Sequence, residues 1–407
     1  MRHSRSATLP REAAPTSSRP PSTSHGRLIG LDLARGLAIV GMFAAHVGPD
    51  PSVGGPLGWL MEVFRGRSSA LFAVLAGFSL VLLTGRPEPK TGRPGRQARG
   101  RVLIRSVILI ALGYALTALD TSVDVILSFY GLLFVLALPL HRLQAGTLAA
   151  IAALSAVVLP QILYLLRVLV SDGVWADGVI AHDPLARITG TDGISELLIT
   201  GEYPVLSWFS FVVAGMAVAK LDLTRAGAAT KLAMTGGVLS AAGYGGSWLA
   251  LHLVPGAQSA VSSSTGGGSA ASAWWSDTIG DPTRLNPHWL LIAAPHSQTT
   301  WSILGNTGIA LLVLATCFIA MDRCTPVKWA ATPAIALGSL ALTAYVGHII
   351  AIKALGMDDL PDAAAPSALL AFTTAALLLA LTWTRYFRRG PLEYVLHAAT
   401  APARLLN

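Results

Sequence analysis

The chain has 407 residues, of which 53% are hydrophobic and only 12% carry a charge. Soluble domains carry roughly 25% charged residues, so this composition excludes an ordinary soluble protein and indicates a chain built for lipid. The formal net charge of +8 indicates membrane topology and contact with anionic lipid, and it argues poorly for binding to nucleic acid.

The N-terminal residues differ sharply in composition from the remainder. Residues 1–26 are rich in Ser, Pro and Arg and hold no apolar run, so we predict a disordered cytoplasmic tail. We expect a membrane domain over residues 27–386 and a basic cytoplasmic segment over 387–407. The predicted fold class is all-α, a polytopic membrane protein of about ten transmembrane helices. The ten apolar segments lie near 28–47, 68–84, 102–119, 123–140, 145–170, 203–220, 230–253, 302–321, 331–353 and 364–384.

The basic residues between these segments predict the topology, because cytoplasmic loops concentrate Lys and Arg. With ten spans, one side of the membrane holds both termini and the even-numbered connections. That side carries 21 of the 29 Lys and Arg, whereas the other side carries six. We therefore predict a multi-pass protein of the cell membrane with both termini in the cytoplasm.

Three polar residues share one stripe of the first apolar segment, Arg27 to Val47 (RLIGLDLARGLAIVGMFAAHV). At ~100° per residue, the steps from Arg35 to His46 return to within about 20° of the same direction, and Asp32 precedes Arg35 by one helical turn. The ends of the stripe are about 16 Å apart along the axis, roughly half a hydrocarbon core. A charge at membrane depth costs ~2.5 to 3.5 kcal/mol, so this stripe should face protein or a water-filled cavity.

The ninth segment, near 331–353, carries a second pair of polar side chains. Tyr345 and His348 are three residues apart on a helix, so both can address one cavity, whereas Thr343 lies on a different side from His348. We expect the polar stripe of the first segment to look into a hollow that it shares with this ninth helix. That hollow should open to both compartments.

Cysteine and histidine patterns elsewhere indicate neither a metal site nor redox chemistry. Cys317 and Cys324 are about 10 Å apart along one helix, too far for a disulfide with each other. The spacing of His288 and His296 is not a recognised metal pattern, and we expect both near the outer surface.

The polar residues of the first and ninth segments also have purely structural interpretations. Asp32 with Arg35 would form an intramembrane ion pair that holds the first helix in register. His348 would donate a hydrogen bond that packs one helix against another. The residues alone leave both interpretations open.

Several segments resemble known membrane acyltransferases. GRLIGLDLARGLAIVGMFAAH resembles the opening helix of the heparan-alpha-glucosaminide N-acetyltransferase family and its bacterial relatives, with their D-x-x-R-G element. It also matches the R-x10-H spacing of acyltransferase family three, as Arg35 to His46. SSALFAVLAGFSL, YPVLSWFSFVVAGMAVAKLDL and GPLEYVLHA are similar to the bacterial YeiB-like branch, and LGSLALTAYVGHII is similar to the late helix of both groups.

The resemblance implies a transmembrane acyltransferase that moves an acetyl or other acyl group from a cytosolic acyl-CoA. Acetyl-CoA would be the cosubstrate, with no tightly bound cofactor and no metal. The acceptor would be a hydroxyl or amine of a sugar, a glycolipid or a small molecule. The expected partners are therefore the lipid bilayer, the donor and this acceptor, with no nucleic acid, and a homodimer is left open.

Roles for individual residues follow from this expected chemistry. His46, near the outer end of the first span, would be the general base. His348 would orient the acceptor or stabilise an oxyanion, with Tyr345 beside it. Arg35 would hold a phosphate or the pantetheine amides of the donor, with Asp32 fixing its guanidinium. Secondary candidates for binding the donor are Arg27, Arg101 and Arg105.

One departure from the family pattern keeps a rival function open. In the human-type enzyme the catalytic histidine lies about eleven residues beyond the position of His46, where this chain has SVGGPLGWL and no histidine. Either His46 takes the role, as the R-x10-H pattern indicates, or this branch does something else. The rival is a transporter or exporter in which Asp32, Arg35 and His46 form a proton or substrate relay. Paired broken helices would favour that rival.

Overall fold

The computed structural model describes residues 23–86, 88–171, 178, 180–183, 185–186, 190–223, 225–264, 270–276 and 286–406. Within these ranges every regular element is a helix and no strand occurs. The predicted all-α class is thus confirmed, as expected for a chain that must satisfy its backbone hydrogen bonds inside lipid. Residues 1–22 of the predicted N-terminal tail lie outside the described residues.

Helices coincide with all ten apolar segments, although they differ in length. Among the described residues, six helical stretches are long and apolar enough to cross a membrane, and one bent helix pair adds a seventh. Two further apolar helical stretches, Leu127–Arg142 and Val205–Lys220, are shorter. The protein is therefore polytopic, while a total of ten crossings stays a prediction.

The helices that correspond to the ten apolar segments are, in chain order, α1 (Thr23–Val47), α3 (Arg67–Thr84), α4 (Gly92–Thr117), α5 (Leu127–Ala137), α6 (Ala145–Ser171), α9 (Val205–Lys220), α10 (Ala228–Ser240) with α11 (Gly246–Leu253), α13 (Thr300–Arg323), α15 (Thr332–Ser339) with α16 (Ala341–Leu355), and α17 (Ala365–Tyr386).

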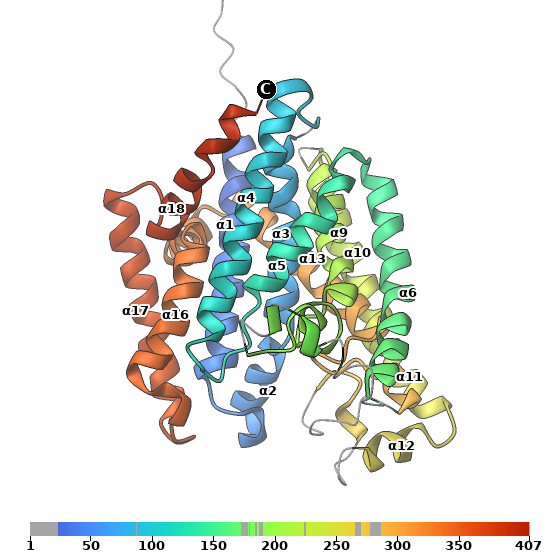
Figure 1. Ribbon diagram of the computed structural model, residues 1–407. Coiled ribbons are helices and arrows are strands. Elements are labelled where there is room, and N and C mark those ends of the chain that lie inside the picture. The colour runs from blue at the N-terminus through green and yellow to red at the C-terminus, as the bar shows by residue number, and fades with distance from the viewer. Residues whose placement is uncertain are drawn as a thin grey trace, which may run out of the picture.

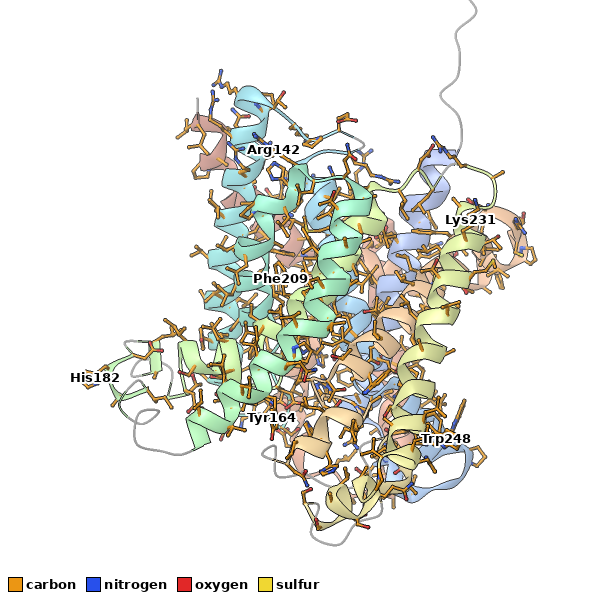
Figure 2. All side chains as sticks on the ribbon, turned by 90° about the vertical axis from the view of Figure 1, so that its right-hand side faces the viewer. Arg142, Tyr164, His182, Phe209, Lys231 and Trp248 are labelled. Carbon is orange, nitrogen blue, oxygen red and sulfur yellow. The ribbon has the colours of Figure 1, made fainter. Side chains whose placement is uncertain are left out.

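The two ends of the helix bundle can be told apart by the chain itself. Figure 1 shows the C-terminus at the upper end and α2 (Gly55–Phe64) at the lower end; because α2 follows α1, helix α1 begins at the upper end. Arg142 and Lys231, both counted on the predicted cytoplasmic side, also lie toward the upper end, whereas Tyr164 and Trp248 lie toward the lower end (Figure 2). We call these the inner and outer ends. Which compartment each end faces stays a prediction.

Helix α1 lies in the middle of the bundle, where it packs against α15, α13 and α3. Small residues let these backbones approach closely. A Cβ atom added at Gly36 of α1 would collide with the backbone of Ala334 on α15, and one added at Gly338 would collide with the carbonyl oxygen of Asp32. This close packing fixes the polar stripe of α1 against the α15–α16 pair.

The α15–α16 pair is a broken helix at the edge of the bundle. The two helices meet at Leu340 with a bend of 87°. Helix α17 packs along α15 and α1, yet only 11% of its most apolar 18-residue stretch is buried. Figure 1 shows α16 and α17 side by side at the left edge, so the outer face of α17 is left for lipid.

Candidate active site

Arg35 is held by two neighbours, one on its own helix and one on α3. Its Nη1 donates to Oδ1 of Asp32 at 2.8 Å, and its Nη2 donates to Oγ of Ser79 at 2.7 Å. The hydroxyl of Ser79 donates in turn to the backbone oxygen of Leu75, one helical turn earlier. The side chains of Arg35 and Asp32 are 23% and 27% exposed. The expected ion pair therefore exists, and it borders open space instead of being sealed in the core.

That open space is a cavity of about 330 Å³ in the inner half of the bundle, which we call the inner cavity. Arg105 of α4 joins Arg35 in its lining. The Nε atom of Arg105 is buried and has no hydrogen-bond partner within the described residues. Two guanidinium groups facing one cavity favour an anionic or amide-rich ligand. The other polar lining residues are Ser79, Tyr130, Ser339, Tyr345 and Glu393.

Glu393 explains how the broken helix is held beside this cavity. It lies on α18 (Pro391–Ala399), and its Oε1 accepts from the backbone N–H groups of Leu342 and Thr343 at 2.7 and 3.1 Å. Its Oε2 accepts from the hydroxyl of Thr343 at 2.6 Å. The carboxylate thus satisfies N–H groups that the break at Leu340 leaves without helical partners, at a helix end that favours negative charge.

His46 at the outer end of α1 contacts His348 of α16 directly. Nδ1 of His46 lies 3.0 Å from Nε2 of His348, and the two rings are almost parallel, with 7° between their planes. His348 is only 2% exposed. Its Nδ1 faces the carbonyls of Ala344 and Tyr345 without a well-aligned hydrogen bond to either.

The chemistry of this pair follows from counting protons. Two neutral imidazoles carry two N–H protons on four nitrogens, and one proton must occupy the bridge between the rings. The second proton then sits on one of the two outward nitrogens, Nε2 of His46 or Nδ1 of His348. The other outward nitrogen keeps a lone pair. In either tautomer the pair therefore presents one acid and one base, which is what a proton relay requires.

Tyr345 completes a group of three rings. Its ring meets His348 edge to face, with the centroids 5.1 Å apart. Its hydroxyl oxygen accepts from the backbone N–H of Ile126 at 3.1 Å. Since the oxygen accepts this bond, the O–H proton can be donated to another group in the inner cavity.

A second polar hollow, of about 230 Å³, lies at the outer end of α1. His46 lines it together with Asp50, Arg65 and Asp358. Ser122 donates to Oδ1 of Asp358 from its backbone N–H at 2.8 Å and from its hydroxyl at 2.7 Å. These two bonds hold the pKa of the Asp358 carboxyl below its ordinary value. We call this space the outer hollow.

The structure corrects the expectation of one hollow that runs along the polar stripe. Arg35 lines the inner cavity and His46 lines the outer hollow, and none of the described residues lines both. His348 lines neither of them; it borders a third space, an apolar groove that it shares with Thr343. Tyr345 and His348 therefore touch each other but face different spaces, because three residues along α16 leave the two side chains about 60° apart around the helix axis. The three rings form the partition where the three spaces meet.

The remaining predicted donor-binding residues are not gathered around Arg35. Arg101 donates from Nε to the backbone oxygen of Gln97 at 3.2 Å and does not line the inner cavity. The side chain of Arg27 lies outside the described residues. Of the two secondary candidates whose side chains the structure describes, Arg101 and Arg105, only Arg105 shares the inner cavity with Arg35.

Two family models divide the chain between them. The model described as heparan-alpha-glucosaminide N-acetyltransferase, catalytic, matches residues 27–245, which is more than half of the chain and includes Asp32, Arg35 and His46. The chain belongs to this heparan-alpha-glucosaminide N-acetyltransferase family. A family of unknown function, DUF418, matches residues 272–403, the part that carries Tyr345, His348 and Glu393. A comparison with curated proteins gives no match.

This member of the heparan-alpha-glucosaminide N-acetyltransferase family also has polar contacts that sequence reasoning missed. Ser79 and Glu393 gave no signal of their own, although Glu393 lies in the segment GPLEYVLHA, which resembles the YeiB-like branch. His296, expected near the outer surface, is only 20% exposed at its side chain, and its Nδ1 lies 2.9 Å from Oε1 of Glu202.

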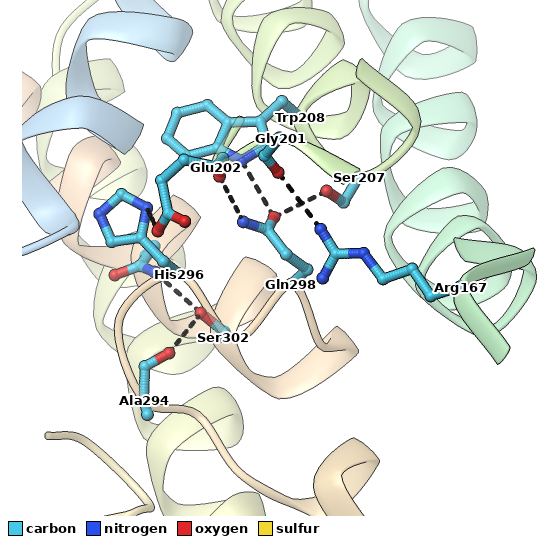
Figure 3. A network of polar contacts seen from close by, with 10 residues as sticks. Arg167, Gly201, Glu202, Ser207, Trp208, Ala294, His296, Gln298 and Ser302 are labelled. Carbon is cyan, nitrogen blue, oxygen red and sulfur yellow. Dashed lines mark hydrogen bonds and ion pairs between the residues drawn. The ribbon is translucent and has the colours of Figure 1, made fainter. Parts of the chain in front are cut away.

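Gln298 lies at the centre of a network of polar contacts that also includes Glu202, the partner of His296. Its Oε1 accepts from the hydroxyl of Ser207 and from Nε1 of Trp208, and its Nε2 donates to the backbone oxygen of Glu202 (Figure 3). His296 and Gln298 both have a positive φ, 56° and 61°, a conformation that non-glycine residues rarely adopt. The network holds the loop before α13 in this shape, at the outer end of the bundle.

Proposed function

We propose that this membrane protein is an acyltransferase of the cell membrane. In this proposal it moves an acetyl or other acyl group from a cytosolic acyl-CoA to a hydroxyl or amine at the outer face. The observation that carries the proposal is the contact of His46, which lines the polar outer hollow, with His348, whose ring touches Tyr345 of the inner cavity. Such a partition is where a donor from one side and an acceptor from the other would meet.

The donor would enter the inner cavity. Arg35 and Arg105 supply charge-assisted hydrogen bonds to phosphate or amide oxygens, and the predominantly apolar wall suits a flexible chain. Its thioester would reach Tyr345, which lines this cavity and touches His348. Binding at Arg35 would then place the reacting carbonyl near the partition.

The transfer itself needs one base and one oxyanion donor. His46 takes the proton of the acceptor O–H or N–H while the acceptor heteroatom bonds to the thioester carbonyl carbon. The O–H of Tyr345 donates to the oxygen that becomes negative. The C–S bond then breaks, the acyl group stays on the acceptor, and coenzyme A leaves as a thiolate that takes up the proton held by the histidine pair.

The rival function, a transporter, would need a path for a whole molecule. The inner cavity and the outer hollow share no lining residue, and the three rings stand between them. Among the described residues, α15 with α16 is the one bent helix pair that is together long and apolar enough to span the membrane. Two such broken helices, related as a pair, would favour a transporter. Acyl transfer requires only that the three rings part far enough for the acceptor heteroatom to reach the thioester carbon, whereas transport requires a path for a whole molecule, so these features support transfer over transport.

The test uses purified protein in lipid nanodiscs with radiolabelled acetyl-CoA and a panel of sugar, glycolipid and amine acceptors. We expect labelled product, and we expect His46→Ala to lower kcat by ~10²- to 10⁴-fold with little effect on acetyl-CoA binding. His252→Ala is the matched control, because His252 is an exposed histidine of α11 that stacks on Trp248. Wild-type turnover in His46→Ala would show that the base is wrongly assigned. Absence of label from every product would contradict the proposed function.

A further inference from the structure

A groove of about 650 Å³ lies between α16 and α17, and we call it the lateral groove. Its walls are almost entirely apolar, with Gly347 and Ala351 on α16 and Ala375 and Leu379 on α17. Its floor is Phe43 of α1, which meets Phe372 of α17 edge to face with the ring centroids 5.1 Å apart. The inner cavity and the outer hollow already have roles in the proposed function, and this groove has none.

The lateral groove lies at membrane depth. It extends on α17 from Ala368 to Trp383 and on α16 from Thr343 to Leu355. At the rise of an α-helix these stretches measure ~22 and ~18 Å, somewhat more than the ~15 Å of one leaflet of hydrocarbon. Helix α17 stands at the edge of the bundle with little of its surface buried. The groove is therefore long enough for a lipid chain, and it lies where such chains are the surrounding solvent.

Met357 shows how the lateral groove is connected to the other spaces. It lines both the groove and the outer hollow, whereas no residue in the described part of the chain lines both the groove and the inner cavity. An apolar groove that meets a polar hollow at its outer end has the shape of a site for an amphipathic molecule. The tail would lie in the membrane and the head group at the outer end.

His348 connects the lateral groove to the histidine pair. His348 lines the groove at 2% exposure, and its Nδ1 has no well-aligned hydrogen-bond partner. This nitrogen faces the carbonyls of Ala344 and Tyr345 on its own helix, so the ring of His348, and not this nitrogen, borders the groove. Since His348 is bonded to His46, a molecule in the groove would touch the same pair that faces the outer hollow.

We propose that the lateral groove binds the hydrophobic tail of a membrane lipid, and that the head group of this lipid, placed in the outer hollow, is the acyl acceptor. The identification of the head group as acceptor rests on the proposed function, whereas lipid binding does not. Three aspartates and one arginine line the hollow, and this surplus of acidic groups favours sugar hydroxyls or an amine over a phosphate. The residues are Asp50, Asp358, Asp362 and Arg65.

Photolabelling tests the site without requiring any transfer. The probe is a glucosaminyl diacylglycerol with a diazirine in one acyl chain, placed in phosphatidylcholine nanodiscs with the purified protein. We expect the label to concentrate on peptides of α16 and α17 and to be displaced by the same glycolipid without the diazirine. Label spread over α6, α10 and α17 in proportion to their exposed surface would overturn the proposal. So would displacement by a long-chain acyl-CoA but not by the glycolipid, because the groove would then hold the donor's chain.

Gly347 offers a substitution that fills the lateral groove without disturbing the fold. A Cβ atom added there meets nothing within 4 Å, and replacing glycine inside a helix removes an unfavourable residue. We expect Gly347→Trp to reduce displaceable labelling about tenfold, the loss expected when a bulky side chain occupies the site. Ala375→Trp on the opposite wall should act alike. Gly237→Trp is the matched control, since a Cβ atom on this glycine of α10 also meets nothing within 4 Å.

Acylation assays with the same variants separate this proposal from the proposed function. Transfer to the glycolipid should fall about tenfold in Gly347→Trp, while transfer to soluble glucosamine should stay near the wild-type rate. If this variant transferred to both acceptors at the wild-type rates and kept the wild-type labelling, the lipid site would be overturned while the proposed acyltransferase activity would be retained. Displaceable labelling of α16 and α17 without transfer to any acceptor would support the lipid site and remove the proposed function.

Discussion

His46 and His348 are separated by 302 positions in the chain, yet Nδ1 of one lies 3.0 Å from Nε2 of the other. Their rings are nearly parallel, and Tyr345 touches the second ring from the inner side. The contact depends on the break at Leu340, because α16 reaches the outer end of α1 only after the chain bends by 87°. The geometry of one broken helix thus decides whether the two histidines can act together.

Removing His348 should impair catalysis more than folding. His348→Ala leaves Nδ1 of His46 without its partner, which costs ~1–3 kcal/mol and corresponds to a ~5- to 150-fold loss in kcat. His348→Gln keeps an amide oxygen that can accept from Nδ1–H of His46, the tautomer in which His46 is a base, and should restore part of the rate. The comparison is of kcat and of KM for the donor. Equal rates for the Ala and Gln variants would argue against a positioning role, since only the Gln variant can keep the hydrogen bond.

Arg35→Ala should weaken donor binding. The loss of a charge-assisted hydrogen bond costs ~1.5–3 kcal/mol, which raises the Kd for acetyl-CoA ~10- to 150-fold. Asp32 would be left unpaired near the membrane interior and should reduce the yield of folded protein. The double variant Asp32→Asn with Arg35→Ala removes that stranded charge, so it separates binding from folding in a calorimetric titration. An unchanged Kd in the double variant would exclude Arg35 from the donor site.

Glu393→Ala should lower thermal stability through the broken helix. Its carboxylate accepts hydrogen bonds from Leu342, Thr343 and the Thr343 hydroxyl, and loss of a helix cap costs ~0.5–2 kcal/mol. Glu393→Gln keeps an accepting oxygen, so its melting temperature should lie between those of the wild type and Glu393→Ala. Glu88→Ala, at an exposed glutamate of the α3–α4 connection, is the control. A melting temperature of Glu393→Ala equal to that of this control would mean that the cap does not stabilise α16.

The topology can be checked with a tag. Because basic residues gather at the inner end, a peptide tag after Asn407 should be accessible to protease only after the cell membrane is opened. A tag in the loop between α1 and α2, for example at Ser52, should be accessible in intact cells. The reverse pattern would invert the assignment of donor and acceptor sides.

Much of the fold could be predicted from the sequence, because length and hydropathy alone locate helices in a membrane protein. All ten apolar segments are helical, and the pairing of Asp32 with Arg35 followed from their spacing of one turn. The family resemblance was carried by local motifs, which a single sequence displays directly. The number of crossings and the sidedness remain predictions, since two apolar helical stretches are shorter than a full span.

The candidate site could be predicted only in its parts. Periodicity placed Tyr345 and His348 near each other, but it could not show which neighbouring helices surround α16, and these neighbours make the two side chains face separate spaces. The roles of Ser79 and Glu393 come from contacts between distant segments, and no local pattern encodes such contacts. The lateral groove could not be predicted from the sequence either, because its lining residues have the composition of any apolar membrane helix.

In the proposed function, donor and acceptor approach the histidine pair from opposite ends of the bundle. The most direct test uses sealed proteoliposomes of uniform orientation, with labelled acetyl-CoA on one side only and a membrane-impermeant amino sugar on the other. We predict labelled product when acetyl-CoA is at the inner end and the sugar at the outer end, and none in the reverse arrangement. Product that forms only when both substrates share one side would contradict the account.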